Sequence, residues 1–304
     1  MHEMTRRRFL GTAGMAAVAP AVGTTMLAQN GQTPAGGGPT SHPGVTLEKN
    51  ISFGKGGDIE LRLDIYRPPP GKANGMATIH IHGGGFTGGS KETLIERASP
   101  YAALGYVACV VQYRLIGQAK WPAQIEDVKA AIRWVRANAK SVGFNPDLLG
   151  VVGHSAGGQL ALFAAGTQLV ACCAYYPSTE VRPRADGTAN NLMAAGSDEA
   201  AHRAASPLTY IAKGFPPTVI FHGTADTTIP LENSERLFKQ LRDAGVEAEF
   251  HAIEGVPHVF DSNPEFAKVA AGLADFFIDR KVLHRRPWGP PSDAGGGGRG
   301  RGRG

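Results

Sequence analysis

Cysteine is scarce in this sequence: the 304 residues include three, Cys109, Cys172 and Cys173. All three lie inside apolar runs, where a thiol is more often a packed side chain than a reactive group or a metal ligand. Cys172 and Cys173 are neighbours, so in a strand they point to opposite faces. We therefore expect no disulfide framework and no metal site.

Net charge is missing from the middle of the chain. The formal charge of +5 comes from the two ends, because residues 1–28 contribute +2 and residues 295–304 contribute +3. A neutral middle argues against a uniformly basic binding surface, so we expect no nucleic-acid partner. The Arg-Gly repeats near the C-terminus are interpreted as a solvated low-complexity tail.

A long apolar run suited to a membrane span is also missing, and the N-terminus has another pattern. An arginine cluster at 6–8 precedes small apolar residues, which is the layout of a signal peptide. The segment TRRRFL resembles the twin-arginine export signature, and the weakly hydrophobic stretch with Pro20 fits that route better than a span. We expect export to the periplasm or beyond, with cleavage after Ala21 or Ala28. An ordinary secretory signal and an uncleaved anchor are the alternatives.

Gly- and Pro-rich sequence separates one large central domain from both ends. We expect a signal peptide over residues 1–28, a linker over 29–44, a catalytic domain over 45–284 and a disordered tail over 285–304. The sequence does not specify an oligomeric state.

Strand-like runs alternate with helical patterns in this domain. The first two, 45–53 and 59–67, alternate apolar and polar residues as half-exposed antiparallel strands do. The later runs are almost continuously apolar, as strands covered on both faces must be. The pattern predicts an α/β domain with a mostly parallel sheet and helices on both faces. The later runs lie at 76–82, 106–114, 148–154, 169–177, 217–223 and 248–255.

Three helical patterns fall between or after these runs, at 121–143, 231–245 and 265–282. The first places one apolar stripe at helical spacing, formed by Ile125, Val128, Ile132 and Val135. For the last, the large apolar residues predict an inner face formed by Phe266, Val269, Leu273, Phe276 and Phe277.

The segment HGGGF, residues 82–86, puts three glycines after a strand-like run. Glycines here allow a backbone N–H to approach a phosphate or an oxyanion. A dinucleotide site also needs an acidic residue about 20 positions on, but residues 101–113 contain neither Asp nor Glu. A P-loop needs a lysine where Ser90 stands. We therefore expect no phosphate-bearing cofactor.

The segment GHSAG, residues 153–157, supplies the other interpretation. A serine in G-x-S-x-G between a strand and a helix sits on a tight turn that projects its hydroxyl above the sheet. Gly153 and Gly157 allow the strand and the helix to come close enough for that turn. Ser155 then needs a histidine base and an acid, in the chain order serine, acid, histidine.

His258 is the predicted base, because it follows the last strand-like run in a Gly- and Pro-containing loop. Asp226 is the predicted acid, because it comes just past the end of the penultimate run. Asp127 precedes the serine in a helical pattern, where Arg114 or Lys129 could make it structural. Asp261 follows the histidine. The other histidines after the serine fit the base role less well: His202, His222, His251 and His284.

The motifs HGGGF, GHSAGG, HGTADTTIP and GVPH together resemble those of the HGGG-bearing α/β-hydrolase esterases, the hormone-sensitive-lipase-like and related bacterial carboxylesterase families. The resemblance covers residues 45–283. It implies an α/β-hydrolase fold with an eight-stranded, mostly parallel sheet and a small cap.

The same resemblance implies a catalytic triad of Ser155, Asp226 and His258, and oxyanion donors at Gly84, Gly85 and Ala156. It also implies supporting roles for His82, which shapes the loop, and for three glycines, Gly83, Gly153 and Gly157. Phe86 departs from the family, whose members often carry tryptophan there, so the shape of the acyl pocket is not transferred.

The sequence thus predicts a metal- and cofactor-independent serine esterase. About forty residues between Pro177 and Pro216 predict a modest cap and an open pocket, which favours short acyl groups, with acetylated or feruloylated carbohydrate as the expected substrate. A prolyl-oligopeptidase-like peptidase is the alternative enzyme; such enzymes usually have a propeller domain before the catalytic one, and we expect none here because residues 1–44 are too few to form it. A pseudo-hydrolase that binds a ligand or partner is the non-enzyme alternative.

Overall fold

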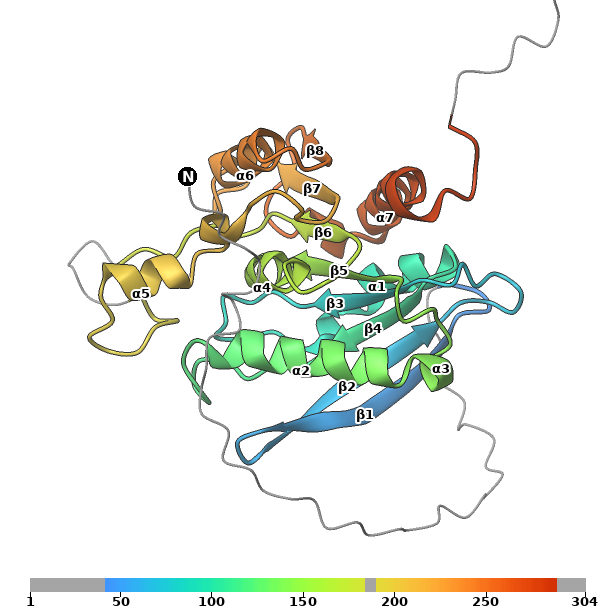
Figure 1. Cartoon of the computed structure of the whole chain (residues 1–304), viewed down its shortest axis with the longest axis horizontal. Coiled ribbons are helices and arrows are strands. Elements are labelled where there is room, and N and C mark those ends of the chain that lie inside the picture. The colour runs from blue at the N-terminus through green and yellow to red at the C-terminus, as the bar shows by residue number, and fades with distance from the viewer. Residues whose placement is uncertain (1–41, 184–189, 289–304) are drawn as a thin grey trace, which may run out of the picture. The chain divides into compact units, whose positions relative to one another are not determined.

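The computed structural model describes residues 42–183 and 190–288. The predicted signal peptide, nearly all of the linker, and the tail beyond residue 288 lie outside these ranges. Within them the chain forms one α/β unit (Figure 1). Its strands are β1 (Thr46–Gly56), β2 (Ile59–Arg67), β3 (Ala77–Ile81), β4 (Val107–Val111), β5 (Leu149–His154), β6 (Cys172–Tyr175), β7 (Thr218–Gly223) and β8 (Ala248–Ile253).

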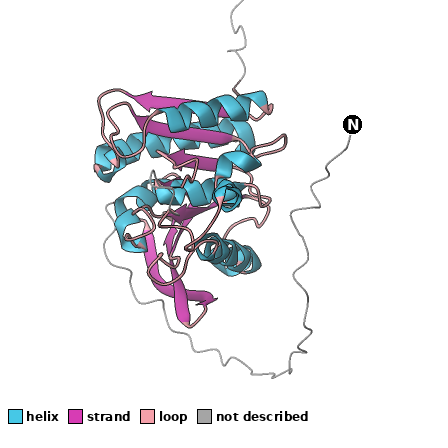
Figure 2. Cartoon of the chain, turned by 90° about the vertical axis from the view of Figure 1, so that its left-hand side faces the viewer, coloured by secondary structure: helices cyan, strands magenta, loops and turns pink. Residues whose placement is uncertain are grey.

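All eight strands belong to one sheet, in the order β1-β2-β4-β3-β5-β6-β7-β8. β1 pairs with β2, and β2 with β4, in antiparallel fashion, whereas the other pairs are parallel. The predicted eight-stranded, mostly parallel sheet is confirmed. The strands at one end of the sheet lie at a large angle to those at the other end, as the twist of such sheets requires (Figure 2).

Helices cover both faces of the sheet and create two apolar cores. One core lies under α2, α4 and α6, and the other under α1 and α7. β3, β4, β5, β6 and β7 are buried along their whole length, which explains their continuous apolar sequence. The helices are α1 (Ile95–Ala103), α2 (Ala123–Ala137), α3 (Ala139–Val142), α4 (Ala156–Ala165), α5 (Glu199–Ala204), α6 (Glu232–Asp243) and α7 (Pro264–Ile278).

The stripe predicted for α2 is buried, but the inner face predicted for α7 is only partly correct: Leu273 is partly buried against the core, whereas three of the five residues are exposed. Phe266, Val269 and Phe276 are 36%, 60% and 42% exposed. Phe277 is buried, together with a face of small residues: Ala267, Ala270, Ala271 and Ala274. α7 packs against α1, and alanines allow two helices to approach closely. Both faces have helical spacing, so side-chain volume misled the prediction.

The crossover from β6 to β7 contains the cap, where α5 lies beyond the edge of the sheet (Figure 1). Hydrogen bonds close the cap at its base: Leu208 N–H donates to Thr179 O (3.4 Å), and Val181 N–H donates to Ser206 Oγ (2.8 Å). Gln159 of α4 also donates to Ala205 O (3.0 Å), which fixes the cap against this helix.

Candidate active site

Ser155 occupies the single residue between β5 and α4. Its φ of 55° and ψ of −118° are strained for a residue with a Cβ. A Cβ on Gly153 would lie 2.1 Å from Gly157 O, and one on Gly157 would lie 2.2 Å from Ile81 O. The flanking glycines therefore let the turn pack against the start of α4 and the end of β3, which holds the strained serine in place.

The three glycines after β3 have separate structural reasons. A Cβ on Gly83 would lie 3.0 Å from the Cβ of Ser155, so this glycine lies directly against the serine. Gly84 and Gly85 have φ values of +111° and +59°, which residues with side chains rarely adopt. Because β3 and β5 are adjacent parallel strands, their following loops meet at the same edge of the sheet.

The backbone N–H groups of Gly84, Gly85 and Ala156 have no hydrogen-bond acceptor within residues 42–183 and 190–288. Ala156 begins α4, so its N–H also lies at the positive end of that helix. Gly84 and Gly85 are exposed, whereas Ala156 is buried, and a buried N–H without a partner is rare in folded proteins. Donors left open on two loops next to one serine are suited to an oxygen that acquires negative charge.

The structure brings Ser155, His258 and Asp226 together. His258 Nε2 lies 3.1 Å from Ser155 Oγ, and His258 Nδ1 lies 2.6 Å from Asp226 Oδ2. Asp226 follows β7 and His258 follows β8, so both reach the carboxyl edge of the sheet where β5 delivers the serine. The serine is 8% exposed and the histidine side chain 13% exposed, so both are largely screened from bulk water.

Asp226 is held as a carboxylate. Its Oδ1 accepts hydrogen bonds from the N–H groups of Thr228 (2.8 Å) and Ile229 (2.9 Å). Burial by itself raises the pKa of Asp226, but the Ile229 N–H and the His258 imidazole more than offset this and hold the pKa below its ordinary value. The carboxylate can therefore stabilise a protonated His258.

His82 supports the glycine loop. Its Nδ1 donates to Gly83 O (2.8 Å), and its ring stacks on Tyr113 with the ring centroids 4.3 Å apart. The Tyr113 hydroxyl in turn donates to His82 O (2.9 Å). Burial lowers the pKa of His82 to about 4, so the ring stays neutral and brings no charge next to the serine.

A buried cluster of charged and polar side chains around one carboxylate, the Asp261 cluster, lies behind the triad. Asp261 is 1% exposed, and its carboxylate lies 2.8 Å from His154 Nδ1 and 3.4 Å from Arg97 Nε and accepts a short hydrogen bond from the Tyr176 hydroxyl. The Tyr176 ring packs edge-on against His258, with the centroids 4.6 Å apart. The cluster thus joins the residue before Ser155 to the loop that carries His258.

A known protein family matches the part of the chain that carries most of this site. The BD-FAE family model matches residues 63–182 and 174–241, which is more than half of the chain. The chain belongs to the BD-FAE family. The matched residues include the glycine loop, Ser155 and Asp226, whereas His258 lies beyond them. The expected membership in the α/β-hydrolase esterases is confirmed.

Relatives of this BD-FAE family chain include esterases. Esterase LipQ of Mycobacterium tuberculosis is 29% identical over 259 residues, covering 75% of this chain and 61% of LipQ. The carboxylesterase NlhH of the same species is 34% identical over 146 residues, covering 45% of each chain. The chain therefore spans less than two thirds of the length of these curated relatives.

The chain covers nearly the whole length of one similar protein of known structure. The thermophilic esterase Est2 of Thermogutta terrifontis superposes with a TM-score of 0.67 at 27% identity, covering 79% of this chain and 94% of Est2. Structures of Est2 are described with propionate bound, with butyrate bound and after phosphonylation by sarin.

The remaining sequence candidates have other environments. Asp127 forms an ion pair with Arg114 (2.7 Å), as the structural interpretation predicted. His202 is buried in the cap, where its Nδ1 donates to Asp198 O. His222, by contrast, lies 3.1 Å from Asp226, a contact that the sequence analysis missed. Its position four residues before the acid, in the segment HGTAD, was the signal available.

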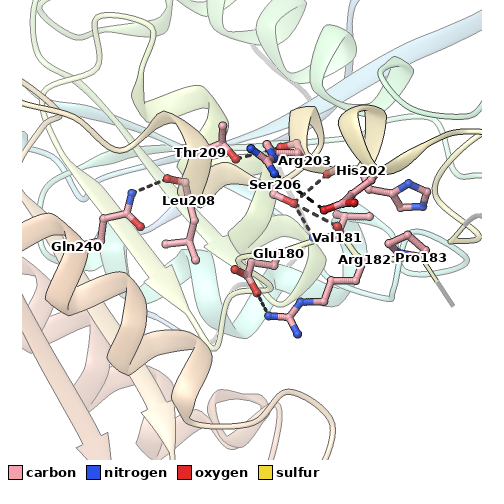
Figure 3. Close-up of a pocket in the computed structure, with 11 residues that line it drawn as sticks. Glu180, Val181, Arg182, Pro183, His202, Arg203, Ser206, Leu208, Thr209 and Gln240 are labelled. Carbon is pink, nitrogen blue, oxygen red and sulfur yellow. Dashed lines mark hydrogen bonds and ion pairs between the residues drawn. The ribbon is translucent and has the colours of Figure 1, made fainter. Parts of the chain in front are cut away.

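A hollow of about 700 Å³ lies in the cap, and it is separate from the triad (Figure 3). Its lining includes Arg203 of α5 and Gln240 of α6, and Glu180 there pairs with Arg182 at 2.5 Å. None of the triad residues lines it. Across the described residues, no three His, Cys, Asp or Glu side chains gather as a metal ion would require, and no helix is long and apolar enough to cross a membrane.

Proposed function

We propose that this chain is a serine-dependent hydrolase of carboxylic esters. The observation that carries the proposal is the hydrogen-bonded series Ser155, His258 and Asp226, set beside open N–H donors. A serine hydroxyl is a weak nucleophile until a base lies within hydrogen-bond reach, and here the base is itself oriented by a carboxylate. Family membership and the esterase relatives support the same activity.

The reaction follows from the geometry. Ser155 Oγ attacks the ester carbonyl while its proton passes to His258 Nε2, and Asp226 stabilises the imidazolium that forms. The carbonyl oxygen becomes an oxyanion that accepts hydrogen bonds from Gly84, Gly85 and Ala156. The intermediate then expels the alcohol, which takes the proton from His258, and leaves an acyl-serine. Water repeats the sequence at the acyl-serine and releases the carboxylic acid.

We infer short acyl groups as the preferred substrates. The small cap supports this, because α5, the α-helix described in the crossover between β6 and β7, has only six residues with which to enclose a long acyl tail. The propionate- and butyrate-bound forms described for Est2 support it as well. Acetylated or feruloylated carbohydrate remains the proposed natural substrate, and the export signal proposed from residues 1–28 is consistent with a polymer outside the cell.

Hydrolysis of p-nitrophenyl esters, from acetate to palmitate, tests both statements. We expect the rate to be highest with short chains and to fall by at least about 10⁴-fold in Ser155→Ala. Ser141→Ala, at an exposed serine on α3, is the matched control and should keep full activity. If Ser155→Ala kept its turnover, as Ser141→Ala should, the proposed nucleophile would be contradicted. A maximum rate with the palmitate ester would contradict the short-chain preference.

A further inference from the structure

His222 is a fully buried histidine at the end of β7, and the mechanism above does not use it. Its Nε2 lies 2.9 Å from Ile229 O and 3.1 Å from Asp226 Oδ2. On the other side of the ring, Nδ1 lies 2.7 Å from Ser234 Oγ on α6. The imidazole therefore bridges the loop of the triad acid and a helix that packs behind it.

The partners of His222 determine its tautomer. A backbone carbonyl and a carboxylate can only accept, so Nε2 must carry a proton and donate to both. Burial lowers the pKa of His222, so the ring is neutral and Nδ1 is left with a lone pair. Nδ1 then accepts from the Ser234 hydroxyl, and every polar atom of the ring has a partner.

This tautomer completes the environment of Asp226. Oδ1 of the carboxylate is held by two backbone N–H groups, those of Thr228 and Ile229. Oδ2 receives His258 on one side and His222 on the other. Without His222, the donor to Oδ2 would be His258 alone, which is the group that changes its protonation during the reaction.

We propose that His222 is a positioning residue that fixes Oδ2 of Asp226 through its Nε2–H and disperses part of the carboxylate charge. The proposal rests on the proposed esterase activity and deepens it. His222 touches neither the substrate nor the serine, so it acts through Asp226 alone. The titratable groups that face it are Asp226 and His258, while its partners Ser234 and the Ile229 carbonyl are uncharged.

Two amide substitutions separate the contacts of His222. In His222→Gln the side-chain amide can reach the place of Nε2 and still donate to Asp226. In His222→Asn the shorter amide reaches the place of Nδ1, near Ser234, but not Asp226. We expect kcat for p-nitrophenyl acetate to fall about tenfold or more in the Asn variant with KM nearly unchanged, and the Gln variant to recover most of it.

The pH profile adds a readout that packing alone would not move. In His222→Asn the carboxylate charge is less dispersed and favours the protonated His258 more strongly. The acid limb of kcat/KM should therefore move to higher pH, and stay in place in His222→Gln. His251→Gln and His251→Asn are the matched controls. His251 is a half-buried histidine on a strand, and it contacts Glu249 rather than Asp226. Equal kcat values and equal acid limbs in both His222 variants would overturn the proposal.

A measurement on the unmodified protein keeps the inference independent of turnover and of variant folding. The ¹⁵N chemical shifts of the His222 ring distinguish the Nε2–H tautomer, which we expect, from the Nδ1–H tautomer. The latter would place a lone pair against the carboxylate and overturn the inference. If the protein hydrolyses no ester, the proposed function fails, but these shifts still decide whether His222 donates to Asp226.

Discussion

Gly84 has two roles: it allows the backbone shape of the loop after β3, and it supplies one of the N–H donors beside Ser155. Gly84 has a φ of +111°, and a Cβ there would lie 2.2 Å from Gly88 O, a backbone atom that cannot move aside alone. Its own N–H is one of the open donors beside Ser155. Glycine is thus needed for the shape of the loop and for the donor that the loop presents.

Gly84→Ala should therefore damage turnover more than folding. A loop shifted by the new Cβ moves the donor away from the oxyanion, and loss of one such donor costs on the order of 10²-fold in kcat. Gly88→Ala is the control in the same loop, because a Cβ there has open space and no positive φ. Kinetics with p-nitrophenyl acetate would measure both, and equal losses would show that the loop tolerates no side chain anywhere.

Much of the candidate site could be predicted at the residue scale, because chemistry limits which residue types fill each role. Ser155 was predicted by its motif, and Asp226 and His258 by chain order and by their positions after strands. His222 was not predicted: its place four residues before the acid was a signal, but its role depends on a contact across the loop that this spacing does not show. Asp261 was considered only as a rival acid, since no sequence signal shows that Arg97, 164 positions away, lies beside it.

At the scale of the elements, periodicity predicted what each segment is better than what it contacts. The central strands were recognisable because strands covered on both faces must be apolar throughout. α7 was recognised as a helix, but its buried face was not, since two apolar faces with the same spacing lie side by side on it. The choice between them depends on how closely α1 approaches, which is a tertiary property.

The Asp261 cluster joins α1, the end of β5 and the loop after β8, so removing its charge should loosen these elements together. Asp261→Asn keeps the shape but leaves Arg97, 10% exposed, without its anion, and breaking a buried pair in this way costs about 3–5 kcal/mol. Urea unfolding at neutral pH would measure the loss. Asp127→Asn also removes a buried carboxylate, the one on α2 that pairs with Arg114, but this pair does not contact His258. It is therefore the control for any change in kcat that accompanies the loss of stability.

The stability lost in Asp261→Asn should depend on pH. Burial alone raises the pKa of Asp261, but His154 and Arg97 hold it below its ordinary value. A lowered folded-state pKa contributes stability above the unfolded-state pKa of about 3.9, and this is lost as pH falls through the folded-state value. The difference between wild type and Asp261→Asn should therefore shrink below about pH 4. A difference that stays constant from pH 7 to pH 3 would contradict the ionised cluster.

At the scale of the whole molecule, the three cysteines report on global unfolding. All are buried, and burial raises the pKa of Cys109 and of Cys173 to about 12 and that of Cys172 well above its ordinary value. A thiol reagent at pH 8 should therefore find no reactive cysteine in the native protein and three after denaturation. Fewer than three in the denatured protein would reveal a disulfide and contradict the sequence prediction.

The closed base of the cap has a consequence for how such a protein can diversify. The described residues at the base of the cap are hydrogen-bonded to each other, and Leu192 O also accepts from Trp121 N–H (3.0 Å). The serine, the acid, the base and the glycine loop all belong to other connections. Doubling the length of a connection such as the cap adds only about 0.6 kcal/mol of closure entropy. We therefore expect the length of the cap to be changeable, by evolution or by design, without altering the catalytic residues, provided that Leu192 and Met193 keep their places in the core.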